Sequence, residues 1–155
     1  MDLLIVAVGR LRPHYREACD DYLRRLRRYA RVEEREVREA GNEAAAAARR
    51  RNDAALLERA PAGASLVALT REGSAWSSRE LAQRLEAWRT TARPVVLLLG
   101  GSHGLGPAVL EQAAVRWSLG PLTLPHELAR VVVVEQLYRA FTMLEGHPYH
   151  KGRER

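Results

Sequence analysis

The sequence predicts an α/β domain in which a mostly parallel sheet is flanked by helices. Short apolar, β-rich runs alternate with segments of helical periodicity, which is the pattern of consecutive strand and helix units. The runs from Leu3 to Val8 and from Pro94 to Leu99 are apolar throughout, as expected for strands buried on both faces of a parallel sheet. No linker, repeat or low-complexity tract interrupts residues 1–155, so a single domain is expected.

The first half of the chain predicts two strands, each followed by a helix. After the strand from Leu3 to Val8, apolar residues recur at intervals of three or four from Pro13 to Tyr29, which indicates a helix. Weak alternation from Arg31 to Val37 predicts the second strand. The segment from Asn42 to Arg59 is rich in alanine, glutamate and arginine, and Asn42 is placed to cap a helix there.

The second half of the chain predicts two further strands and three helices. A serine caps the first of these helices, and proline and glycine residues separate the elements. In chain order they are a strand from Ser65 to Thr70, a helix from Ser77 or Ser78 to Thr90, a strand from Pro94 to Leu99, a helix from Ala108 to Val115 and a helix from His126 to Glu145.

The composition indicates a basic protein of a reducing compartment. Its 25 basic residues against 19 acidic ones give a formal net charge of +6, and every basic residue except Lys151 is arginine. Arginine binds RNA phosphates, but a GC-rich coding bias produces the same excess, and both explanations stay open. The single cysteine, Cys19, excludes an intramolecular disulfide and a multi-cysteine metal site. Because neither a signal peptide nor a long apolar run is present, we expect a cytoplasmic protein, and we predict no metal.

Two segments have the backbone features of a ligand pocket. A predicted strand ends in Gly100 and Gly101 and passes Gly104 before the next helix, and glycines there allow a ligand to approach the backbone. This turn lacks a dinucleotide fingerprint and the lysine of a phosphate-binding loop, so a tight turn without a ligand explains it equally well. The loop from Gly120 to Pro125 is made rigid by two prolines and is either a pocket wall for a flat heterocycle or a plain connection.

The last helix and the C-terminal tail carry polar groups with more than one interpretation. His126, at the start of the helix, could accept a proton or cap a turn. Glu135 and Arg139 are four residues apart and are expected to pair on one helix face. The tail from Glu145 to Arg155 combines histidines, an aromatic residue and basic groups, which suits an RNA-facing segment or a frayed basic end.

These segments together resemble the ribosomal RNA large-subunit methyltransferase H family, the 23S rRNA pseudouridine methyltransferases of the SPOUT class. The resemblance covers essentially the whole chain, and the order, spacing and C-terminal position of the fragments make their combination specific. The matching fragments are Leu3–Gly9, Leu97–Gly101, Gly104–Leu105, Trp117–Leu119, Leu122–His126, Glu135–Ala140 and His147–Lys151.

The resemblance implies a SPOUT α/β-knot fold with a C-terminal trefoil knot, and a homodimer whose partner completes each site. It also implies that S-adenosyl-L-methionine is bound by backbone at three strand ends, which by position are Leu69, Gly101, Gly120, Pro121, Leu122, Thr123, Leu124 and Pro125. The implied reaction methylates ring nitrogen 3 of a pseudouridine in 23S rRNA, and a proton must leave that nitrogen. We expect Tyr149 and His150 to face the substrate and Arg139 to hold phosphate or the developing charge.

Two alternatives from other function classes are compatible with the residues. A non-catalytic RNA-binding or ribosome-associated module would share the basic charge and the tail but would not bind S-adenosyl-L-methionine. A nucleotide-binding α/β protein would use the glycine turn for phosphate, but the usual lysine and acidic partner are missing. The methyltransferase is therefore the leading prediction.

Overall fold

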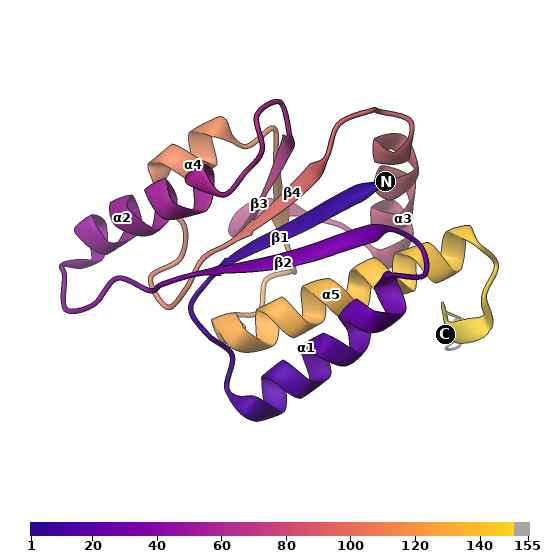
Figure 1. Cartoon of the computed structure of the whole chain (residues 1–155), viewed down its shortest axis with the longest axis horizontal. Coiled ribbons are helices and arrows are strands. Elements are labelled where there is room, and N and C mark those ends of the chain that lie inside the picture. The colour runs from indigo at the N-terminus through magenta and orange to yellow at the C-terminus, as the bar shows by residue number, and fades with distance from the viewer. Residues whose placement is uncertain (151–155) are drawn as a thin grey trace.

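Five parallel strands form one sheet in the part of the chain that the computed structural model describes, residues 1–150 (Figure 1). The strand order is β2-β1-β4-β3-β5, and every neighbouring pair is parallel. The strands are β1 (Asp2–Val8), β2 (Arg31–Val37), β3 (Ser65–Ala75), β4 (Val95–Leu99) and β5 (Val115–Ser118). The helices are α1 (Pro13–Leu26), α2 (Ala45–Glu58), α3 (Ser78–Arg89), α4 (Pro107–Gln112), α5 (His126–Leu144) and the 3₁₀ helix η1 (Pro148–His150).

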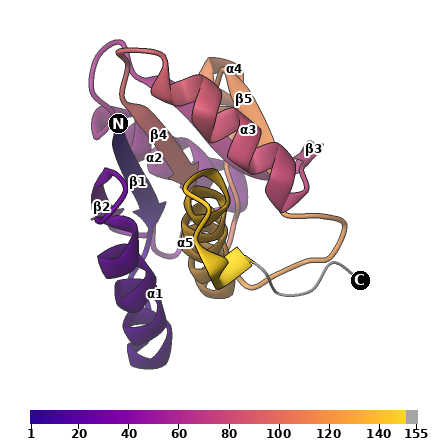
Figure 2. The ribbon, with the colours of Figure 1, turned by 90° about the vertical axis from the view of Figure 1, so that its right-hand side faces the viewer.

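Helices cover both faces of the sheet, and the inner strand β1 shows why. Alternate side chains of a strand point to opposite faces. Leu3 belongs to the core cluster shared with α1, α3 and α5, whereas Leu4 belongs to the cluster shared with Leu56 of α2 and Val109 of α4. Figure 2 shows α5 lying between α1 and α3 on one of these faces. The strand is therefore buried on both sides, as its apolar run predicts.

Two of the helix boundaries predicted in the first half of the chain are wrong. The helix α2 begins at Ala45 with Ala44 as its N-cap, and no side chain caps it, so Asn42 is not the cap. The alanine run has a high helix propensity and therefore starts the helix without a side-chain cap. The helix α1 ends at Leu26 rather than at Tyr29, because the last predicted turn is not helical.

The structure contains a strand, β5, that the sequence analysis did not predict. The helix predicted from Ala108 to Val115 ends at Gln112, and Val115 begins the strand instead. The strand is short and pairs with β3 at the edge of the sheet, so its extended shape depends on a partner distant in sequence. β3 in turn continues past Thr70 to Ala75.

The parallel arrangement brings the carboxyl ends of the strands to one edge of the sheet, where the loops after β3, β4 and β5 begin. The predicted α/β class, with a parallel sheet between helices, is confirmed. The trefoil knot stays a prediction. No helix within residues 1–150 is long and apolar enough to cross a bilayer.

Candidate functional site

A cavity of about 720 Å³ lies at the carboxyl edge of the sheet. Its walls come from Leu69 to Glu72 in the middle of β3, the end of β4 with the turn that follows it, the loop after β5 and the first half of α5. Ligands of open α/β sheets bind at this edge, because loops from neighbouring strands meet there. Cavities of roughly 300–1,000 Å³ are typical of small-molecule sites. The position and size of the cavity therefore suit a cofactor.

The glycine turn, residues 100–106, presents backbone rather than side chains to the cavity. Gly104 has a φ of 72°, in the left-handed region that favours glycine, and its N–H donates to Gly101 O at 3.0 Å. A Cβ on Gly100 would lie 2.6 Å from the backbone of Gly104, so a side chain there would force the turn apart. Because these three glycines line the cavity, a ligand can approach the backbone closely.

The loop after β5 forms another wall of the cavity. Gly120 has a φ of 118°, and its N–H donates to Ser118 Oγ at 3.1 Å. The Ser118 hydroxyl in turn donates to Gly120 O at 3.2 Å. These two bonds to one hydroxyl hold the backbone where it leaves the strand.

Four of the residues predicted to bind the cofactor line this cavity: Leu69, Gly101, Gly120 and Pro121. Leu122 and Leu124 line an adjoining, mostly apolar cavity of about 110 Å³. Thr123 and Pro125 line neither cavity, and Pro125 is the N-cap of α5. The structure thus brings Leu69 of β3, the glycine turn and the loop after β5 together, as the resemblance implies.

Basic side chains outnumber acidic ones in the wall of the larger cavity. Arg49, Arg71, His103 and His126 line it, and Glu72 is the acidic residue beside them. Such a rim attracts the phosphates of a nucleic acid. The sequence analysis did not single out the two arginines. Arg71 follows the end of a predicted strand, which is a usable signal, whereas Arg49 lies within α2 and has no local signal.

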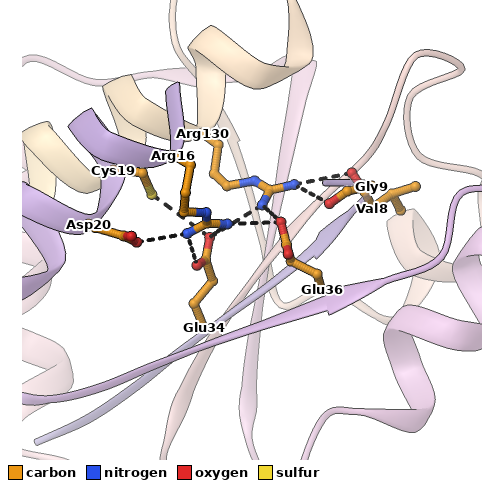
Figure 3. A network of polar contacts seen from close by, with 8 residues as sticks. All are labelled: Val8, Gly9, Arg16, Cys19, Asp20, Glu34, Glu36 and Arg130. Carbon is orange, nitrogen blue, oxygen red and sulfur yellow. Dashed lines mark hydrogen bonds and ion pairs between the residues drawn. The ribbon is translucent and has the colours of Figure 1, made fainter. Parts of the chain in front are cut away.

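Arg130 of α5 holds its helix against the ends of β1 and β2 (Figure 3). Its side chain is 2% exposed, and its Nη2 donates to Val8 O at 3.2 Å and to Gly9 O at 2.8 Å. Its Nη1 forms ion pairs with Glu34 and Glu36 of β2. The network therefore fixes the half of α5 that lines the cavity.

Arg16 and Cys19 of α1 extend this network, as Figure 3 shows. Arg16 Nη1 pairs with Glu34 at 2.6 Å and with Asp20 at 2.9 Å. Burial, together with the negative charge of Glu34, raises the pKa of the Cys19 thiol to about 12. The thiol is therefore neutral at physiological pH and contributes packing rather than nucleophilic chemistry.

Arg139 and Tyr149 lie toward the other end of α5 and share one carboxylate. Arg139 Nη2 pairs with Glu135 Oε1 at 2.6 Å, and Tyr149 Oη donates to the same oxygen at 3.1 Å. Burial, and after it the hydrogen bond with Tyr22, raises the pKa of Tyr149 above its ordinary value. Tyr149 is therefore a hydrogen-bond donor at neutral pH and not a base. The pairing of Glu135 with Arg139 confirms the expectation from their spacing.

Within one chain, neither Arg139 nor Tyr149 lines the cavity. An α-helix rises about 1.5 Å per residue, so about 20 Å of α5 separate His126 from Arg139. Tyr149 packs beside Arg139, whose guanidinium carbon lies 5.2 Å from the ring centroid. The side chain of His150 lies outside the described residues. Arg139 and Tyr149 thus lie apart from the predicted cofactor residues that line the cavity.

Comparison with known sequences gives full-length matches. Residues 1–150 match the family model described as a predicted SPOUT methyltransferase. The chain is 48% identical to the ribosomal RNA large subunit methyltransferase H of Gloeobacter violaceus, over 98% of this chain and 100% of that protein. It is 53% identical to the protein of the same name from Rubrobacter xylanophilus, over 94% of this chain and 96% of that protein.

Comparison with solved structures supports the fold. A probable methylase family protein from Haemophilus influenzae matches with a TM-score of 0.56 and 15% identity, over 99% of this chain and 72% of that chain. A probable methyltransferase from Bordetella pertussis matches with a TM-score of 0.51 and 22% identity, over 90% of this chain and 95% of that chain. At these identities the likeness concerns the arrangement of strands and helices.

Proposed function

The chain belongs to the SPOUT methyltransferase family, and on this premise we propose that it is an S-adenosyl-L-methionine-dependent methyltransferase of 23S rRNA. The proposed product carries the methyl group on ring nitrogen 3 of a pseudouridine. The observation that carries the proposal is the cavity at the carboxyl edge of the sheet, whose walls are backbone turns and leucines. We place the reaction in the cytoplasm, on RNA of the assembled ribosome.

The wall of the cavity fits an adenosyl cofactor. Gly101, Gly104 and Gly120 line the cavity without side chains, so backbone groups there can hydrogen-bond the edge of a purine. Leu69 and Leu105 supply apolar surface for the faces of the ring. S-adenosyl-L-methionine, when bound, supplies an electrophilic methyl group. The residues of this chain hold the cofactor and shield it from water.

The basic rim supports RNA as the substrate. Arg71 is exposed and has no ion pair with an acidic side chain of residues 1–150, so its guanidinium is available to a phosphate. The ring nitrogen must lose its proton before it attacks, and a cation that stabilises the ionised ring lowers the barrier. We assign this role to Arg139, with Tyr149 and His150 lining the substrate side.

In this proposal a second copy of the chain completes the site. Arg139 lies about 9 Å along α5 beyond Val133, the last residue of the helix that lines the cavity, and its guanidinium is paired with Glu135, so in this proposal it acts at the cavity of a partner. Several partly exposed apolar side chains lie on α5, among them Leu128, Val131 and Val132. In the loop that precedes this helix, Leu122 is 76% exposed. Exposed apolar surface of this kind supports a contact between two copies.

Two measurements on the wild-type protein test the proposal. Calorimetric titration with S-adenosylhomocysteine tests the cofactor, and mass spectrometry of 23S rRNA after incubation of unmethylated ribosomes with S-adenosyl-L-methionine tests the reaction. We expect binding and one added methyl group on a pseudouridine. A protein that binds ribosomes but neither binds S-adenosylhomocysteine nor methylates RNA would instead be the non-catalytic RNA-binding module.

A further inference from the structure

A buried carboxylate without a cationic partner lies directly behind the glycine turn. Asp53 of α2 is 0% exposed and forms no ion pair within residues 1–150. Its Oδ1 accepts the Gly106 N–H at 2.9 Å, and its Oδ2 accepts the Val109 N–H at 3.0 Å. A buried charge without a counter-ion is costly unless hydrogen bonds compensate it. Here the compensating donors come from the end of the turn and the first residues of α4.

A second carboxylate holds the start of the same turn. Glu39, which follows β2, accepts both the N–H and the hydroxyl of Ser102 through Oε1, at 3.1 Å and 2.5 Å. The bond from the hydroxyl is the largest cause of the lowered pKa of Glu39, so this side chain is ionised at neutral pH. A Cβ added to Gly101 would lie only 2.8 Å from Glu39 Oε1. Carboxylate and turn therefore fit each other closely.

The two carboxylates are linked through the middle of α2. Asn52, beside Asp53, is 1% exposed and accepts the Ala40 N–H at 3.1 Å, which ties the residue after Glu39 to α2. The Asn52 Nδ2 has no hydrogen-bond partner among the described residues. Buried polar groups that are left unpaired reduce stability. Asn52 and Asp53, two polar residues whose burial costs stability, are thus neighbours in sequence at the point where α2 supports the glycine turn.

We propose that Asp53 and Glu39 are positioning residues for the cofactor, because they hold the two ends of residues 101–106 in the shape that binds S-adenosyl-L-methionine. The inference rests on the proposed function. Neither carboxylate lines the cavity, so each acts through the backbone of the turn, whose residues Gly101, His103 and Gly104 do line it. A turn that is held in its bound shape loses less conformational entropy when the ligand binds.

The test compares variants that differ in how many hydrogen bonds to the turn remain. Glu39→Ala removes the acceptor for Ser102, and Glu39→Gln keeps one acceptor oxygen and serves as the conservative rescue. Asp53→Asn keeps one acceptor but places an amide donor against a backbone N–H. The matched control is Ser77→Ala, which removes the hydroxyl that accepts the Glu80 N–H and caps α3, a helix that does not line the cavity.

The readouts are the Kd for S-adenosylhomocysteine, the KM for S-adenosyl-L-methionine, kcat and the melting temperature. We expect Glu39→Ala and Asp53→Asn to raise Kd and KM about tenfold, the factor expected for losing one hydrogen bond to a charged group, with kcat at saturating cofactor nearly unchanged. Glu39→Gln should restore most of the affinity. Ser77→Ala should lower the melting temperature without changing Kd. Hydrogen exchange should speed up in residues 101–106 of Glu39→Ala and stay unchanged in β1.

The outcomes separate this inference from the proposed function. If the wild-type protein does not bind S-adenosylhomocysteine, the proposed function fails and the inference fails with it. If the wild type binds and Glu39→Ala and Asp53→Asn bind equally well, the inference alone is overturned. It is also overturned if Ser77→Ala weakens binding as much as they do. Should Asp53→Asn not fold, the half-buried Glu39 and its two variants decide the question.

Discussion

The two ends of α5 differ in whether the groups around them are free to contact a ligand. At its N-terminal end, His126 borders a cavity of about 720 Å³ whose walls are largely backbone and whose rim is basic. Toward its C-terminal end, Arg139 and Tyr149 already share Glu135, and the Tyr149 ring packs on Tyr138 with centroids 4.6 Å apart. The first end is ready to receive a ligand, whereas the second end is closed by its own contacts.

This difference suggests how the work is divided between two chains. An α-helix has a fixed rise per residue, so His126 and Arg139 stay about 20 Å apart in every conformation in which α5 is intact. In the proposed dimer, one end serves the cofactor of its own chain, and the other serves the RNA at the cavity of a partner. Arg130 lies between them and fixes the helix on the sheet. Substitutions of Arg130, of Arg139 and Tyr149, and of Arg71 beside the cavity should therefore affect these parts separately.

Arg130→Ala should have the largest effect on stability. The substitution leaves Glu34 and Glu36 without this partner and removes the donors to Val8 O and Gly9 O, so we expect a loss of about 3 kcal/mol in the free energy of unfolding. Urea denaturation measures it. Arg31→Ala is the control, because Arg31 is 86% exposed and its pair with Asp2 should contribute less than about 1 kcal/mol. Equal losses for both variants would contradict the prediction.

Arg139→Ala should separate catalysis from cofactor binding. If this guanidinium stabilises the charge that develops on the RNA, the methylation rate should fall by about 100-fold or more, while the Kd for S-adenosylhomocysteine stays unchanged. Single-turnover methylation of ribosomes and calorimetry measure the two quantities. Arg139→Lys keeps the charge but loses the planar fork, so its rate should lie between the two. Near wild-type rates for Arg139→Ala and for His150→Ala would remove both residues from the catalytic role.

Arg71→Ala should weaken RNA binding at the open end only. Losing one phosphate contact should lower the slope of log affinity against log salt concentration by about 1 and leave the affinity for S-adenosylhomocysteine unchanged. The control is Arg93→Ala, an exposed arginine that precedes β4 and so lies at the opposite edge of the sheet. If the two variants lose ribosome affinity equally, only net charge matters and the basic rim has no specific role.

Tyr149→Phe should have the smallest effect, and it should appear at alkaline pH. The pKa of Tyr149 is raised in the folded protein, chiefly by burial, so its contribution to stability is complete below the ordinary pKa of tyrosine, about 10. That contribution is lost as the pH rises through the higher folded-state value. Wild-type protein should therefore lose more stability than Tyr149→Phe between pH 9 and about pH 11. If the melting temperatures of the two proteins fall equally over this pH range, the Tyr149 hydroxyl does not make the buried contacts described.

The strands and the pocket turns that the sequence predicts share a local signal. β1 and β4 are apolar at nearly every position, and glycine or proline marks the turns at Gly101 and at Gly120, so composition within a few residues was enough. A serine cap of α3 was likewise predicted, with Ser77 and Ser78 both possible, and the structure shows Ser77 as the N-cap in a capping box with Glu80.

The features that were missed depend on distant partners. β5 is extended because it pairs with β3, and nothing within its four residues requires that. The role of Asp53 behind the glycine turn needs the packing of α2 on α4, which joins residues more than 50 positions apart. Asn42 had the right residue type for a cap, but the alanine run began the helix at Ala45 without it.

The central claim, that one chain holds the cofactor while its partner supplies Arg139, is tested most directly by mixing two inactive variants. Gly101→Val fills the cofactor turn, where even a Cβ would meet Glu39 and Val8, and Arg139→Ala removes the catalytic cation. Each variant alone should be inactive. Mixed dimers contain one complete site if the site is shared, so co-expression should restore methylation, to about a quarter of the wild-type rate if the chains pair at random. Mixed dimers with no activity would show that each site is built from one chain and would contradict the account.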